Sequence, residues 1–152
     1  MANLGCGCPG SQVRTVEKTE TTETTATGRL TSELRQWPTQ LHLVPPSAPY
    51  LQNAHLLIAA DCAPFAYAEF HRDFIKGRVL VNACPKLDDT STYVDKLAAM
   101  ISQNDVQSVT VPIMEVPCCR GLAMMAEQAV AKSGKDVPLE IVIIGIDGQR
   151  RN

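Results

Sequence analysis

The chain has 152 residues, of which 45% are hydrophobic and 20% are charged, and its formal net charge at pH 7 is −2. These values are typical of a globular protein with one sizeable core, and they argue against a nucleic-acid or membrane-surface partner. No apolar run approaches the roughly 20 residues that span a bilayer, and the first ten residues do not resemble a signal peptide, so we expect a cytoplasmic protein.

The first 31 residues are expected to form an arm in front of the folded domain. Residues 1–12 are rich in Gly and Cys, and residues 14–31 are dominated by Thr and Glu with almost nothing to bury. A segment with so few apolar side chains cannot offset the entropy of ordering its backbone. We therefore assign residues 1–31 to a cysteine-containing arm and linker, and residues 32–152 to an α/β domain.

Two short patterns open the predicted domain. Residues 32–37 predict a helical turn that ends before Pro38, because proline cannot continue a helix. Residues 40–44, QLHLV, alternate apolar and polar side chains and predict an edge strand. Three prolines within the next five residues then favour an extended connection.

From residue 54 onward the sequence predicts alternating strands and helices. Short apolar runs predict strands over residues 55–60, 78–83, 107–116 and 139–146. Longer segments with helical periodicity predict helices over residues 64–76, 89–103 and 120–132. Asp88 or Asp89 is the expected N-cap of the second helix, and Gly134 the C-terminal stop of the third. Pro112, inside the third strand, predicts a bulge or an irregular edge.

This alternation predicts a parallel sheet with right-handed crossovers, because consecutive parallel strands need a helical connection between them. The nearly continuous apolar strands agree, since parallel strands are buried on both faces. We expect a small flavodoxin-like or half-Rossmann sheet with strand order 2-1-3-4, the order being taken from common topology.

Six cysteines are scattered through the chain, namely Cys6, Cys8, Cys62, Cys84, Cys118 and Cys119. In a reducing cytosol, a cysteine-rich chain more often binds metal or carries out redox chemistry than forms structural disulfides. Zinc-finger spacings and the usual ferredoxin runs are both missing from the sequence. The significance of the thiols therefore depends on where the fold brings them.

Four of these cysteines follow predicted strands directly. Cys62 follows the first strand, Cys84 the second, and the adjacent Cys118 and Cys119 the third. In open α/β sheets, ligands bind at the carboxyl ends of the strands, and neighbouring strands lie about 4.8 Å apart. In the order 2-1-3 the four thiols would converge at one edge, where the N-termini of the following helices favour thiolates.

Four converging thiolates suit a tetrahedral zinc ion or an iron–sulfur cubane. A zinc site usually takes its ligands from tight knuckles, whereas these ligands come from three separate loops and include an adjacent pair. A [4Fe–4S] cluster fits that spread better. Buried free cysteines also serve as small apolar core residues, but four at equivalent topological positions favour a shared site.

Cys6 and Cys8 form a separate Cys-x-Cys motif flanked by glycines. They could belong to a flexible tail, or the arm could fold back and add ligands. In the second case all six thiolates could hold a larger cluster, or the pair could serve a second site shared with a partner or with another copy of the chain in a homodimer. Lys86 and Arg120 each follow a cysteine closely and are candidates to offset the negative charge of a cluster.

Several stretches resemble, as a set, a family of iron–sulfur proteins of anaerobic bacteria and archaea, described as 4Fe-4S binding or ferredoxin-like. These stretches are LRQWPTQLHLVPPSAPY, LIAADCAPFAYAEFHRDFIKGR, ACPKLDD, MEVPCCRGL and IGIDG, and the resemblance extends from Leu34 to Gly148. It implies that Cys62, Cys84, Cys118 and Cys119 are cluster ligands. Longer members resemble a tandem ferredoxin module joined to this domain, whereas this chain has only GCGCPG upstream.

The sequence therefore predicts an iron–sulfur protein for electron transfer or redox chemistry in anaerobic metabolism. Its expected partner is a redox protein, either a ferredoxin or an oxidoreductase. Two alternatives stay open: a cluster-dependent reductase of a small molecule, and a zinc or thiol redox-sensing module.

Overall fold

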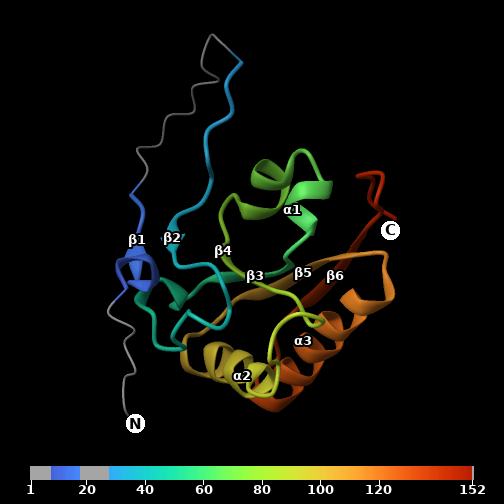
Figure 1. Ribbon diagram of the computed structural model, residues 1–152. Helices are drawn as coiled ribbons and strands as arrows, with labels where there is room; N and C mark the ends of the chain where they lie inside the picture. The colour runs from blue at the N-terminus through green and yellow to red at the C-terminus, as the bar shows by residue number, and fades with distance from the viewer. Residues whose placement is uncertain (1–7, 18–27, 152) are drawn as a thin grey trace.

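The computed structural model describes residues 8–17 and 28–151, and its centre is a four-stranded parallel sheet (Figure 1). The strands are β3 (His55–Ala60), β4 (Val79–Ala83), β5 (Ser108–Met114) and β6 (Leu139–Ile144). Their order is β4-β3-β5-β6, which confirms the predicted order 2-1-3-4 and the α/β class.

Helices cover both faces of this sheet (Figure 1). On one face lie α2 (Tyr93–Gln103) and α3 (Arg120–Ser133), which pack against each other. Their buried side chains recur at helical spacing, as Tyr93, Leu97 and Ile101 do in α2, so each helix turns one apolar stripe to the sheet. As predicted, α3 ends at Gly134, whose φ of 70° is the left-handed conformation that glycine adopts without strain.

The prediction of one continuous helix over residues 64–76 is wrong. Only α1 (Ala63–Ala66) is α-helical; the chain then becomes extended at Tyr67 and forms one wide, π-helical turn over His71–Ile75. The rings of Tyr67 and Phe70 both contact Phe74, with centroids 5.2 and 5.0 Å away. Burial of Phe70, Phe74 and Ile75 under the sheet therefore outweighs the helical preference of the segment.

The predicted helical turn over residues 32–37 is also wrong. Gln36–Trp37 forms β2, which pairs antiparallel with β1 (Arg14–Thr15), a part of the predicted arm. The Gln36 side chain is buried, and it donates to the Leu80 carbonyl (2.5 Å) and accepts from the Leu80 amide (3.5 Å). Because these two bonds tie β2 to β4, this segment has to be extended.

The predicted edge strand over residues 40–44 is reduced to one bridge. Gln40 pairs with Asn82 beside β4, and the chain then turns so that Leu41 and Val44 are buried in the core. Within the described ranges, the structure contains no helix long and apolar enough to cross a membrane.

Candidate functional site

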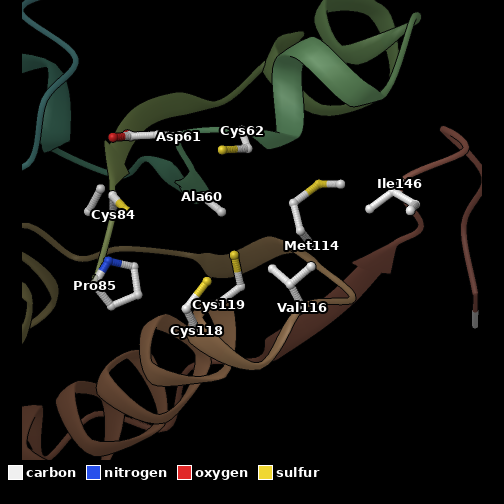
Figure 2. A pocket seen from close by; sticks show the side chains of 11 residues that line it. Ala60, Asp61, Cys62, Cys84, Pro85, Met114, Val116, Cys118, Cys119 and Ile146 are labelled. Carbon is white, nitrogen blue, oxygen red and sulfur yellow. The ribbon is translucent and has the colours of Figure 1, made fainter. Parts of the chain in front are cut away.

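A hollow of about 220 Å³ opens at the carboxyl edge of the sheet, and the four predicted cysteines line it together (Figure 2). Cys62 follows β3, Cys84 follows β4, and Cys118 and Cys119 follow β5. The other side chains of the lining are mostly apolar; they are Ala60, Asp61, Ala83, Pro85, Met114, Val116 and Ile146. The predicted convergence of these thiols is therefore present in the fold.

Pro112 lies just beyond the point where the pairing between β3 and β5 ends. It forms no bulge, because it pairs in regular register with Val142 of β6. The amides of Val109 and Glu115 donate to the β6 side. Because successive amides of a strand point in opposite directions, the amides of even-numbered residues of β5 point toward β3. Proline has no N–H to offer there, and the β3–β5 pairing ends at Thr110, two residues earlier. Beyond that point no ladder pair joins β3 and β5 in the described part of the chain, and Ala60 of β3 and Met114 of β5 line the hollow.

The loss of this pairing leaves the next even-numbered amide for the site. The Met114 backbone forms a hydrogen bond with the Cys119 thiol and lowers its pKa. Burial is the largest influence and acts in the opposite direction, and the adjacent Cys118 and the facing Cys62 also raise the pKa. The net effect is a raised pKa, so the Cys119 thiol favours its neutral form unless a positive charge is bound nearby.

Three of the thiols lie at the start of helical turns. Cys62 precedes α1, and its carbonyl accepts from the amides of Phe65 and Ala66 (both 3.2 Å). Cys118 and Cys119 belong to a 3₁₀ turn, Pro117–Cys119, that runs directly into α3. The fourteen-residue α3 directs its free N-terminal amides toward this end of the hollow, which favours negative charge there. Cys62 and Cys118 are exposed, whereas Cys119 is only 6% exposed.

Cys84 lies on a loop instead, because α2 begins nine residues later, at Tyr93. The loop is closed by Asp88, whose amide donates to the Cys84 carbonyl (2.9 Å) and whose carboxylate accepts from the Cys84 amide (3.0 Å). The predicted capping role is wrong for both Asp88 and Asp89, since Thr92 occupies the N-cap position of α2.

Gly121 lets the Cys84 loop approach α3 closely. A Cβ atom at this position would lie 3.3 Å from Cβ of Pro85, tighter than an ordinary van der Waals contact. The absence of a side chain just after the cysteine pair therefore brings the Cys84 loop against the turn that carries Cys118 and Cys119.

The opposite wall comes from the C-terminal loop, through Ile146. The Glu115 carboxylate accepts from the Ile146 amide (3.2 Å) and from the Arg151 guanidinium (2.9 Å). These bonds lower the pKa of Glu115, the one to Arg151 most strongly. The C-terminal loop is thus fixed against the end of β5, and Ile146 lies next to Met114 on the side of the hollow opposite Cys84 (Figure 2).

The comparisons with known proteins agree with this architecture. Residues 48–151 match the family described as "Rossmann-like domain". The chain belongs to this Rossmann-like domain family. A protein of Archaeoglobus fulgidus, named only "Uncharacterized protein", is 34% identical over 116 residues, which are 76% of this chain and 81% of that protein. No solved structure gives a significant match. Neither match names iron–sulfur binding or a ferredoxin module, so that part of the resemblance stays a prediction.

The remaining predicted site residues of this Rossmann-like domain lie away from the hollow or outside the described residues. Lys86 and Arg120 are exposed, do not line it, and form no ion pair within the described ranges, so their proposed role stays a prediction. Cys8 is exposed next to the β1–β2 ribbon, where Trp37 donates to the Gly10 carbonyl (2.6 Å). Cys6 lies outside the described residues.

Asp61 lines the hollow, and its carboxylate accepts from the Asn82 side-chain amide (2.6 Å). This contact links the ends of β3 and β4. Within the described part of the chain, no three His, Cys, Asp or Glu side chains form a group that could hold a metal ion.

Sequence reasoning missed the contribution of Asp88, the Met114 amide and Ile146. The position of Asp88 before a helix predicts a cap, and only the structure shows that its carboxylate accepts from the Cys84 amide instead. The amide of Met114 could have been identified from Pro112, whose missing N–H ends the pairing of β5 with β3. Ile146 carries no local signal, because only the turn after β6 brings it to the hollow.

Proposed function

We propose that this Rossmann-like domain binds an iron–sulfur cluster, foremost a [4Fe–4S] cubane, and serves in electron transfer or redox chemistry. The ligands would be Cys62, Cys84, Cys118 and Cys119. The observation that carries the proposal is that four thiols from three separate strand-to-helix connections line one hollow. A bound cluster would supply a one-electron store whose potential depends on burial, charge and hydrogen bonds to sulfur.

The surroundings of the thiols suit an anionic, sulfur-rich group. The Met114 amide and the N-terminus of α3 provide N–H groups at Cys119, and such donors stabilise thiolates. Ala60, Met114, Val116 and Ile146 line the rest of the hollow with apolar surface that limits access of water. Burial raises the pKa of Cys119, and a bound cation would act in the opposite direction by stabilising its thiolate form.

The origin of the thiols favours a cluster over a single ion, because they come from three separate loops and not from the tight knuckles usual in zinc sites. Around one zinc ion, all four sulfurs would lie about 2.3 Å from the same point. A cubane is larger and binds each thiolate at a different iron, so its ligands can stay further apart.

The proposed setting is a reducing cytoplasm with a redox protein as partner. The cysteines within the described ranges are all free thiols. Phe65, Leu87 and Ile146 are exposed on the segments that carry or line the site, and a partner could cover them while it exchanges electrons.

The test is to measure iron and acid-labile sulfide per chain after anaerobic purification and reconstitution, with EPR of the reduced protein. We expect about four of each and a reducible signal, as for one cubane. Cys84→Ser and Cys119→Ser should each lose most of the iron, whereas Cys8→Ser should lose none, because Cys8 does not line the hollow.

Other results would change or refute the proposed site. Loss of iron in Cys8→Ser, or about eight iron atoms per chain, would bring the N-terminal cysteines into a larger or second cluster. Bound zinc in place of iron would support a single-ion or sensing module. A chain that holds no metal even after reconstitution would refute the cluster and leave a thiol switch as the best account of the site.

A further inference from the structure

Cys84 is held differently from the other thiols of the hollow. Cys62 and Cys119 belong to helical turns, where main-chain bonds such as Cys119 amide to Val116 carbonyl (3.2 Å) fix the backbone. Cys84 is followed by a loop, and its amide donates to a carboxylate, that of Asp88. The position of this thiol therefore depends on a side chain outside the predicted ligand set.

The Asp88 carboxylate is anchored from its other side by Tyr93. The phenol donates to Oδ2 of Asp88 (2.7 Å), the same oxygen that accepts from the Cys84 amide. Tyr93 is the first residue of α2 and is 1% exposed, so its ring is fixed in the core. Burial, and next the bond to Asp88, raise the pKa of Tyr93 and keep it a proton donor. The loop is thus tied to the helix layer through two consecutive hydrogen bonds.

We propose that Asp88 is a positioning residue that holds Cys84 in place for the cluster and adds one negative charge beside it. This inference rests on the proposed function and names a residue that tunes the same site. Outer residues that orient a ligand typically change metal affinity about 10- to 100-fold when they are lost. A fixed negative charge next to the site disfavours the reduced, more negative cluster and so lowers its potential.

The first arm of the test uses the metal-free full chain. Cys84 and Cys62 are alkylated with iodoacetamide, and the two rates are compared by peptide mass spectrometry, so that Cys62 serves as the internal control. We expect Asp88→Ala to raise the ratio of the Cys84 rate to the Cys62 rate several-fold, and Tyr93→Phe to raise it less, because that variant keeps the bond from the amide. An unchanged ratio in a chain with native circular dichroism would overturn the positioning role.

The second arm uses reconstituted protein and the shape-preserving change Asp88→Asn. We expect iron retention to fall about 10- to 100-fold in Asp88→Ala. The midpoint potential should rise in Asp88→Asn, since that variant removes the charge and keeps the size; an unchanged potential would overturn the electrostatic part. If Asp88→Ala does not fold, Tyr93→Phe tests the positioning role by alkylation and Asp88→Asn tests the charge through the midpoint potential. Because the alkylation arm needs no metal, it tests whether Asp88 positions Cys84 even if the wild-type chain binds no iron and the proposed function fails.

Discussion

Gly148 offers a direct test of how the C-terminal loop is fixed against α1. Its φ is +84°, and a Cβ atom there would lie 2.7 Å from the Ala66 carbonyl oxygen at the end of α1. The substitution Gly148→Ala therefore combines two costs. Left-handed backbone costs a residue with a side chain about 1–2 kcal/mol, and forcing an extra methyl group into packed surroundings costs about 1–3 kcal/mol. We expect a loss of about 2–5 kcal/mol in the free energy of unfolding.

Gly134→Ala is the matched control. Gly134 has nearly the same conformation, with φ +70°, but a Cβ atom there would have no neighbouring atom within 4 Å. It should cost only the strain, about 1–2 kcal/mol. The difference between the variants then measures the contact with α1, and at a urea m-value of about 2 kcal/mol/M it amounts to about 1 M in the midpoint of unfolding. Equal midpoints for the two variants would refute the close approach of the C-terminal loop to α1.

Three further predictions concern the site and the sheet edge. Gly121→Ala should change the free energy of unfolding by less than about 1 kcal/mol, because the helical preference of alanine offsets its tight contact with Pro85. It should, however, change the alkylation rate of Cys84, which precedes Pro85. An unchanged rate would count against that contact. The pKa of Glu115 is lowered in the folded state, so its contribution to stability is present above the unfolded value of about 4.5 and is lost as the pH falls through the lower folded value. Glu115→Gln should therefore weaken the decrease in the free energy of unfolding as the pH falls below 4.5. An unaltered pH profile would contradict the pairing of Glu115 with Arg151. Gln36→Ala should cost about 1–3 kcal/mol in urea unfolding, because it leaves main-chain groups of β4 buried without their partner; a smaller loss would indicate that water replaces it.

The pattern of the sequence was sufficient for the sheet and for two of its helices. Apolar runs of strand length predicted β3, β4, β5 and β6, and regular spacing predicted α2 and α3, because these elements bury a face whose period matches their geometry. The convergence of four thiols followed from the strand order alone, since parallel strands place all their carboxyl ends at one edge.

The details of the site required the tertiary structure. The break in the helix after Ala66 depends on aromatic rings packed under the sheet, and the extended form of residues 36–37 depends on two bonds to a strand 44 residues away. The sheet above the rings and the β4 partner of Gln36 both lie outside a local window of sequence. The same holds for Ile146, which reaches the hollow through the turn after β6.

What the sequence by itself determined is that four thiols follow strands of a parallel sheet, because chain order, element length and apolar period leave few ways to build one. Their meeting also needed the strand order, which was taken from common topology. What only the tertiary structure decided is how each thiol is held: Cys84 through Asp88 and Tyr93, and Cys119 through an amide made available by Pro112. The physical reason is that hydrogen bonds depend on position and direction within a few tenths of an ångström, whereas the burial of apolar faces depends mainly on their spacing along the chain.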